Sequence, residues 1–418
     1  MPFLTHKLFP GFDTKALADT VLLSRIMLLS PMLLGISNLF ATITQTFKKF
    51  FVYALAPIFY NVGIIVGILV LYPVFGITGL AYGVALGSLL HMLIQLPIVI
   101  RQGFLPRLQI AIKWSSLVEV LKHSLPRTLA LSMPKIVFLI FVSLASTLAA
   151  GTISVFNLSY NLQSVPLAII GVSYSLAAFP VLVEYFTNQE MDKFRSHVIG
   201  PIRQIIFWSL PIVALFIVLR AQIVRVILGT GNFDWSDTRL TAASLALFII
   251  SVVAQSIVML LIRAYYAAGR TWKPLLLNIV SATATVLFAY LFVYIFNTYH
   301  HVQDFFEGLL RIKNVPGSSV IMLSLAYSVG MFLSLGLLWY SFKRDFNPDV
   351  KSFGITKTMV HSVSASLLLG AVSYVMLQIT AHIFSKDTTL GVFGHGFFAG
   401  IIGIFVAGVY LLLLKNEE

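Results

Sequence analysis

The sequence contains no cysteine and little charge. With no cysteine among 418 residues, disulfides, thiolate catalysis and zinc–thiolate sites are all excluded. Only 10% of the residues are charged, whereas 58% are hydrophobic and the mean hydropathy is +0.93. A water-soluble globular chain of this composition would have an almost wholly apolar surface. The composition therefore predicts an integral membrane protein.

Strict apolar–polar alternation is also lacking, which excludes an outer-membrane barrel. The apolar runs are continuous and about 20 residues long, as helical membrane spans require. They end at typical breaks such as Tyr72-Pro73, Gly229-Thr230-Gly231-Asn232 and Asn347-Pro348. The sequence thus predicts an all-α polytopic membrane protein of about eleven spans. These are 21–46, 50–72, 76–100, 125–149, 153–186, 198–219, 238–268, 273–297, 318–342, 357–383 and 391–414.

Catalytic and metal-binding patterns are missing as well. The nine histidines show no zinc spacing, no glycine-rich phosphate loop follows a strand, and no paired carboxylates share a helix face. We therefore expect no catalytic residue, no metal, no cofactor and no enzymatic activity. The predicted cytoplasmic turns are too short for an ATP site, so any transport would depend on the membrane potential, an ion gradient or removal of the product.

The net charge of +13 has an uneven distribution. Eighteen of the 28 basic residues fall in alternate connections, in 48–49, 101–127, 193–203, 263–273, 343–357 and the C-terminus. The positive-inside rule assigns these segments to the cytoplasm. The N-terminus is then expected outside, which is the orientation obtained if an odd number of spans precedes it. The basic excess indicates topology and attraction to anionic lipids, and we expect no nucleic-acid partner.

Two parts of the chain match at constant offsets. Pro57 and Asn61 recur 217 positions later as Pro274 and Asn278, and the run from Leu80 to Val84 recurs 245 positions later from Leu325. The first three predicted spans therefore resemble the seventh to ninth in the same orientation. Transporters with parallel repeats bind substrate between the halves, near mid-membrane.

The two offsets, 217 and 245, differ by 28 residues. These extra residues form an outer loop around 298–318, between the eighth and ninth predicted spans. Its apolar residues (Phe305, Phe306, Leu309, Leu310 and Ile312) are interleaved with polar ones, a spacing that predicts an amphipathic helix at the outer interface. Such a helix is either a passive surface element or a lid over an outward opening.

A series of short motifs resembles the MurJ/MviN lipid II flippases of the multidrug/oligosaccharidyl-lipid/polysaccharide exporter superfamily. Each motif is weak by itself, whereas their order and spacing from Phe9 to about Arg344 are specific. They are Pro10-Gly11-Phe12-Asp13, Arg25-Ile26-Met27, Ala56-Pro57 with Asn61, Ala145-Ser146, Gly151-Thr152-Ile153-Ser154, Val165-Pro166-Leu167, Gly171-Val172, Phe179-Pro180, Gly229-Thr230-Gly231-Asn232-Phe233, Arg263-Ala264-Tyr265-Tyr266-Ala267, Thr271 and Pro274.

The resemblance implies a domain organisation. The family has fourteen spans and the match begins near the end of the third, so the chain is expected to lack the first three spans of an incomplete two-lobe fold. The implied parts are a remnant (1–16), a partial N-lobe of three spans (17–104), a C-lobe of six spans (105–346) and two additional spans that form a groove for a lipid tail (347–418).

The resemblance also implies a substrate, a polyprenyl-diphosphate-linked peptidoglycan precursor. Arg25 lies inside the first predicted span, where a lipid-facing charge is costly, and is the first choice for a diphosphate contact. Snorkelling to the interface is the alternative. Lys135 is the second choice. The family has a substrate-binding arginine where this chain has Asn161, and Asn157 lies one turn away on the same face. These asparagines either bind sugar and diphosphate or join helices.

Three further in-span polar residues, Asn61, Asn278 and Gln255, are expected to be structural or to line a cavity. Glu184, at the cytoplasmic end of the fifth predicted span, is the one acid close to a span that we consider for binding a proton or a sodium ion, and it is better interpreted as a solvated helix-end carboxylate.

Together these features predict a flippase that moves lipid II from the cytoplasmic to the outer leaflet by alternating access, in the bacterial inner membrane. The expected partners are the lipid-linked oligosaccharide, membrane lipids and cell-wall synthesis proteins. A polysaccharide repeat-unit exporter and a non-transporting scaffold of wall synthesis are the alternatives. A cationic-drug exporter ranks lower because the spans have almost no acids.

Overall fold

The computed structural model describes residues 2–47, 49–104, 114–231, 233–347, 354–384 and 388–414, and all regular structure within these ranges is helical. The chain forms two compact units, Met1–Val120 and Leu121–Glu418. The finer boundaries expected at 16, 104 and 346 remain a prediction. Some basic residues that set the expected orientation (Lys48, Arg107, Lys113, Lys351, Lys386 and Lys415) and Asn232 lie outside the described residues.

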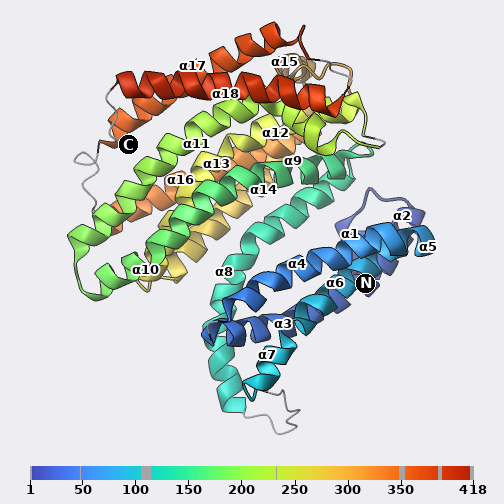
Figure 1. Cartoon of the computed structure of the whole chain (residues 1–418), viewed down its shortest axis with the longest axis vertical. Coiled ribbons are helices and arrows are strands. Elements are labelled where there is room, and N and C mark those ends of the chain that lie inside the picture. Colours follow the sequence, from blue (N-terminus) through green and yellow to red (C-terminus); the bar gives the residue numbers. More distant parts are fainter. Residues whose placement is uncertain are drawn as a thin grey trace. The chain divides into compact units, whose positions relative to one another are not determined.

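The first unit contains three helical segments of membrane-spanning length, Thr14–Thr46, Phe50–Phe75 and Ile77–Arg101, each made of consecutive helices (Figure 1). Its elements are α1 (Pro2–Leu8), α2 (Thr14–Met27), α3 (Leu29–Thr46), α4 (Phe50–Val66), the π-helical turn η1 (Gly67–Leu71), α5 (Tyr72–Phe75), α6 (Ile77–Leu93) and α7 (Leu96–Arg101).

A long helix, α8 (Trp114–Ser146), begins in the first unit and continues in the second. The remaining elements are α9 (Thr152–Leu167), the π-helical turn η2 (Ala168–Val172), α10 (Ser173–Thr187), α11 (Met191–Leu228), α12 (Trp235–Ile249), α13 (Ser251–Ala267), α14 (Trp272–Thr298), α15 (His300–Leu310), α16 (Val320–Phe346), α17 (Ile355–Thr380) and α18 (Thr389–Leu413).

These helices confirm an all-helical polytopic membrane protein. Within the described ranges, nine helical segments are long and apolar enough to cross a membrane. Helices α12 and α13, bent by 41° at their junction, together form a tenth candidate. The span expected at 125–149 lies in α8, whose described apolar part, Ser132–Ser146, is shorter. Each of the eleven expected spans thus corresponds to helix.

In the first unit, α6 packs against α2, α3 and α4. Glycines bring α4 and α6 into backbone contact, because a Cβ atom placed on Gly63 of α4 would lie 2.2 Å from the Cα of Gly87 of α6. Small residues permit this close approach between membrane helices, where dispersion contacts and interhelical hydrogen bonds replace the hydrophobic effect. Ser30 of α3 and Ser88 of α6 add a hydrogen bond of 2.5 Å between their hydroxyls.

In the second unit, α16 has the corresponding position and packs against α12, α13 and α14. An aromatic cluster of Phe141, Phe156, Phe248 and Tyr327 fills the core there, with ring centroids between 5.3 and 6.4 Å apart. The two matching sequence segments therefore adopt the same local arrangement, in which the third span of each segment contacts the other two.

The C-terminal helices α17 and α18 run alongside each other and pack on α11 (Figure 1). Gly403 of α18 permits this pairing, since a Cβ atom there would lie 2.0 Å from Ser373 Oγ of α17. Leu219 of α11, Leu377 and Ala399 form the apolar contact beneath the pair.

The outer loop forms a helix, α15, as expected from its spacing. Its faces differ from the simple amphipathic expectation, because Glu307 is buried and its Oε1 accepts hydrogen bonds from Gln303 (2.9 Å) and Ser318 (2.6 Å). Phe305 and Leu309 are exposed instead. The buried hydrogen bonds compensate for the desolvation of this carboxylate.

Candidate functional site

Arg25, the first predicted diphosphate contact, lies in the last turn of α2. The helix begins at Asp13, whose carboxylate accepts a hydrogen bond of 2.7 Å from the backbone of Ala16. The Arg25 side chain is exposed, has no ion-pair partner among the described residues, and lines a hollow of about 360 Å³ between α1 and α2 together with His6 and Leu22. The hollow belongs to the first unit.

Lys135 lies in α8 of the second unit, after Pro134, and is exposed. It makes no ion pair with any residue in the described part of the chain. Three residues later, Phe138 contacts Tyr160 of α9, with ring centroids 4.9 Å apart. Helices α8 and α9 are therefore in contact near Lys135 and near Asn161.

Asn157 and Asn161 share a face of α9, as their spacing requires. Asn157 is half-buried, Asn161 is exposed, and neither side chain has a hydrogen-bond partner within the described ranges. The structure thus places two amide groups on one helix face without using them to join helices.

The three residues expected to be structural or to line a cavity differ from each other. Asn61 in α4 is exposed and Asn278 in α14 is half-buried, and their side chains form no hydrogen bond to the described residues. Gln255 is buried in α13 and joins three helices. It donates to Gln163 of α9 (3.1 Å) and accepts from Tyr327 of α16 (3.1 Å). Gln255 therefore has the contacts of a helix-joining residue.

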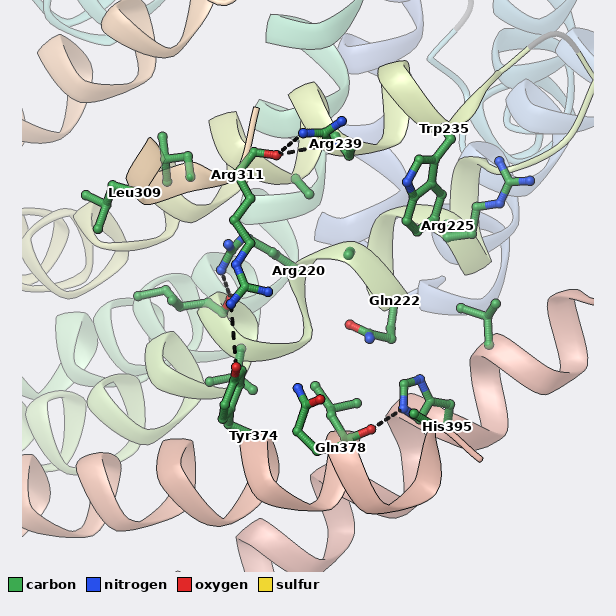
Figure 2. A pocket seen from close by; sticks show the side chains of 18 residues that line it. Arg220, Gln222, Arg225, Trp235, Arg239, Leu309, Arg311, Tyr374, Gln378 and His395 are labelled. Atoms are coloured by element: carbon green, nitrogen blue, oxygen red, sulfur yellow. Dashed lines mark hydrogen bonds between the residues drawn. The ribbon is translucent and has the colours of Figure 1, made fainter. Parts of the chain in front are cut away.

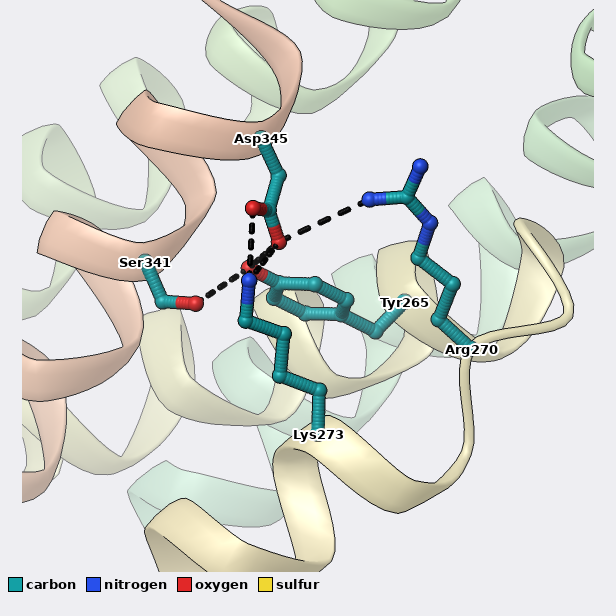
Figure 3. A network of polar contacts seen from close by, with 5 residues as sticks. All are labelled: Tyr265, Arg270, Lys273, Ser341 and Asp345. Atoms are coloured by element: carbon teal, nitrogen blue, oxygen red, sulfur yellow. Dashed lines mark hydrogen bonds and ion pairs between the residues drawn. The ribbon is translucent and has the colours of Figure 1, made fainter.

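Sequence reasoning missed an acidic residue at the end of α16. The Asp345 side chain, 11% exposed, accepts hydrogen bonds from Lys273 and from Tyr265 (3.0 Å) and lies 3.6 Å from Arg270 (Figure 3). This cluster joins the ends of α13, α14 and α16. Like Glu184 in the last turn of α10, Asp345 lies in the last turn of a helix long and apolar enough to span a membrane. Glu184 itself is exposed.

Sequence reasoning also missed a pocket of about 650 Å³ in the second unit (Figure 2). It lies between the end of α11, the start of α12, the residue after α15, and the adjoining ends of α17 and α18. We call it the arginine pocket because four of its lining residues are arginines: Arg220, Arg225, Arg239 and Arg311. The sequence did contain an indication of this pocket. All four arginines lie outside the basic segments assigned to the cytoplasm and so belong to the outer side, but the charge distribution was interpreted only as a guide to orientation.

Neutral groups orient these arginines. Arg220 donates to the carbonyl of Ile217 (2.8 Å) and Arg225 to the carbonyl of Phe233 (3.1 Å). Arg239 donates to the carbonyl of Arg311, and Arg311 contacts the hydroxyl of Tyr374 at 3.5 Å. The Arg225 guanidinium also lies 6.0 Å from the ring centroid of Trp235.

The described ranges contain no group of three or more side chains of the usual metal-binding types that could hold a metal ion. The polar groups described above are mainly cations, amides and hydroxyls, which can bind anions and sugars.

Comparison with known proteins supports the resemblance. The family model described as "Lipid II flippase MurJ" matches residues 1–392, a wider range than the motifs indicated. A probable lipid II flippase of Bdellovibrio bacteriovorus is 28% identical over 238 residues, which are 56% of this chain and 46% of that protein. One from Vibrio cholerae is 24% identical over 360 residues, 82% of this chain and 68% of that protein.

The chain thus spans about half to two thirds of the length of these relatives. The solved structure of a lipid II flippase in an inward closed conformation has the same fold, with a TM-score of 0.75 at 20% identity, and the match covers 99% of this chain and 79% of the other. The family is one of transporters and not of enzymes. On the match across residues 1–392, this multi-pass membrane protein belongs to the lipid II flippase MurJ family.

Proposed function

We propose that the protein moves a polyprenyl-diphosphate-linked peptidoglycan precursor, lipid II, from the cytoplasmic to the outer leaflet by alternating access between two lobes. The observation that carries this proposal is the family match over residues 1–392. We further propose that the protein lies in the bacterial inner membrane with its C-terminus in the cytoplasm, because the positive-inside rule assigns the basic connections to that side.

The substrate determines which residues are needed. Moving a diphosphate through hydrocarbon is opposed by roughly tens of kcal/mol in the Born limit, so its path must be wet and cationic. Arg25 and Lys135 suit this role because they are exposed cations on apolar helices without an acidic partner in the described part of the chain. The lipid tail must stay in an apolar environment, which the additional helices α17 and α18 are proposed to supply.

Asn157 and Asn161 suit the sugar and the diphosphate oxygens. Their amides share one face of α9, are accessible and have no hydrogen-bond partner within the described ranges, so their donors and acceptors are available. The family arginine is absent at Asn161, and we propose that Lys135 on the neighbouring helix α8 supplies the missing charge. A lysine provides a point charge instead of a bidentate fork.

An inside-negative potential would favour this direction of transport. Moving one negative charge outward gains about 2.3 kcal/mol per 100 mV. No nucleotide hydrolysis is required by this proposal.

The test is rescue of a flippase-depleted strain by this chain, followed by measurement of the leaflet that holds lipid II. We expect the wild-type chain to restore outer-leaflet lipid II, and Arg25→Ala with Lys135→Ala to abolish rescue at equal membrane abundance. The control is Lys343→Ala, which removes an exposed cation at the end of α16. Unchanged lipid II distribution on expression of the wild-type chain would exclude the flippase function and favour the scaffold alternative.

A second complementation experiment tests the remaining alternative, a polysaccharide repeat-unit exporter. If the chain restores the export of a polysaccharide repeat unit in a strain lacking that exporter and has no effect on lipid II, the proposed substrate is wrong and the transport mechanism is retained.

A further inference from the structure

The arginine pocket has a large excess of positive charge. None of the described residues that line it is acidic, and the four arginines form no ion pair with any residue that the structure describes. Arg220 and Arg311 lie close enough to repel each other (Figure 2). Three of the four are partly buried, and partly buried charges need compensation.

The hydrogen bonds that these arginines make leave most of their donors unused. A guanidinium carries five N–H donors, whereas Arg220 and Arg225 each use one in the contacts described above. Bonds to neutral carbonyls fix the direction of a guanidinium without neutralising it. Remaining donors that converge on one pocket match the oxygens of a phosphate group, for which arginine has the appropriate fork geometry.

Two other parts of the lining indicate what is attached to that phosphate. The buried Oε1 of Gln222 has no hydrogen-bond partner, and Gln378 lies near it in the pocket (Figure 2). A headgroup hydroxyl would satisfy such an acceptor. The lining also includes apolar side chains, among them Leu309, Leu377 and Val392. The pocket is therefore built for an amphiphile with a phosphate and hydroxyl groups.

We propose that the arginine pocket binds the phosphate headgroup of an anionic membrane lipid, such as phosphatidylglycerol or cardiolipin. Its volume of about 650 Å³ lies within the range of small-ligand sites. All four arginines belong to the side that the charge bias assigns to the outside, so the lipid would come from the outer leaflet. Because the lining residues come from α11, α12, α17 and α18, the bound lipid would join the C-terminal pair to the helices beneath it.

This inference does not rest on transport, and the same chemistry has two other sources, namely free phosphate anions and the diphosphate of a transported lipid. The experiment uses the purified full chain in detergent and measures lipid retention by native mass spectrometry and the apparent melting temperature. The additives are phosphatidylglycerol, cardiolipin, the zwitterionic phosphatidylcholine, and inorganic pyrophosphate.

We expect the anionic lipids to be retained and to raise the melting temperature, and phosphatidylcholine to do neither. The double variant Arg220→Gln/Arg311→Gln should bind the anionic lipids at least about tenfold more weakly, since one hydrogen bond to a charged group is worth roughly a factor of ten in affinity. The matched control, Lys193→Gln/Arg195→Gln, removes the same charge at the opposite end of α11, where both cations have acidic partners.

Equal lipid binding by the double variant and the control would overturn the proposal. Pyrophosphate alone giving the full stabilisation would overturn the lipid source and identify a site for free anions. If the double variant does not fold, Gln222→Leu provides the second test, and unchanged selectivity for phosphatidylglycerol over phosphatidylcholine in that variant would remove the assigned role of the amide. None of these results depends on whether the protein moves lipid II.

Discussion

The matching helix pairs α4–α6 and α14–α16 show how one sequence pattern is stabilised in two ways. In α4–α6 the backbones touch at Gly63 and Gly87. In α14–α16 the close contact is between a side chain and a backbone, because a Cβ atom on Gly330 would lie 2.0 Å from Thr285 Oγ1. The second pair is also joined at its end by Asp345 and Lys273. The corresponding positions in the first pair, at the same offsets, are Ile100 and Ala56.

The repeated run that begins at Leu80 and at Leu325 is also more buried, and has more polar contacts, in its second copy. Tyr82 is 44% exposed, whereas its counterpart Tyr327 is 7% exposed and donates to Gln255. The second pair lies within a unit that has further spans to pack against it. The comparison teaches that the repeated sequence specifies the pairing of helices, while the polar contacts depend on the neighbours that each copy has acquired.

The largest effect is expected at the backbone contact of the first pair. Gly63→Val should prevent the approach of α4 and α6 and destabilise the fold by about 3 kcal/mol or more, since neither backbone can move aside. The measurement is the folded yield and the apparent melting temperature in detergent. The control is Gly35→Val in α3, where a Cβ atom meets nothing within 4 Å. A melting temperature equal to that of the control would show that this contact does not hold the pair together.

A substitution at the close contact of the second pair, α14–α16, should destabilise the fold less, and a second substitution should restore the lost stability. Gly330→Ala is expected to cost about 1 to 3 kcal/mol by overpacking against Thr285. Adding Thr285→Ala should recover most of this loss, because the Thr285 hydroxyl bonds only to Ser281 of its own helix among the described residues. The apparent melting temperatures of the two single variants and the double variant test this. If the double variant loses as much stability as the two single variants together, the close contact of the second pair is not the contact between Gly330 and the Thr285 side chain.

Removing the ion cluster should weaken the second pair alone. Asp345→Asn leaves Lys273 and Arg270 without their carboxylate, and we expect a loss of about 1 to 2 kcal/mol, reduced from the value for a buried pair because the two cations are 40% and 50% exposed. The difference in melting temperature from wild type should shrink at high salt. Asp192→Asn, at a position that is 98% exposed, is the control and should change little.

The smallest effect compares the two tyrosines of the repeat. Tyr327→Phe removes the hydrogen bond to Gln255 and should cost about 1 kcal/mol. Tyr82→Phe should be neutral, since its side chain is exposed and hydrogen-bonds to no described residue. Thermal melting of the two variants in parallel decides this, and equal losses would contradict the assignment of the polar contact to the second copy alone.

Span positions could be predicted from the sequence because hydropathy and punctuation act locally. The repeat was visible for the same reason, through Pro57, Asn61 and their counterparts. The sites were harder. Arg25 was chosen for its place inside a predicted span and Asn161 from a motif position. The arginine pocket and the Asp345 cluster arise instead from residues far apart in the chain, from Ile217 to His395 in the pocket, that meet only when the helices pack. Tertiary neighbours of this kind leave no local signal.

The widened turn η2 divides the span that carries Asn157 and Asn161. A π-turn adds one residue, and since each residue advances a helix by about 100°, the two halves present different faces. Before the turn, α9 packs on α12 and α16. After it, α10 packs on α11 and α13. One continuous span thus contacts the core cluster around Phe156 before the turn and a separate core cluster around Leu182 after it.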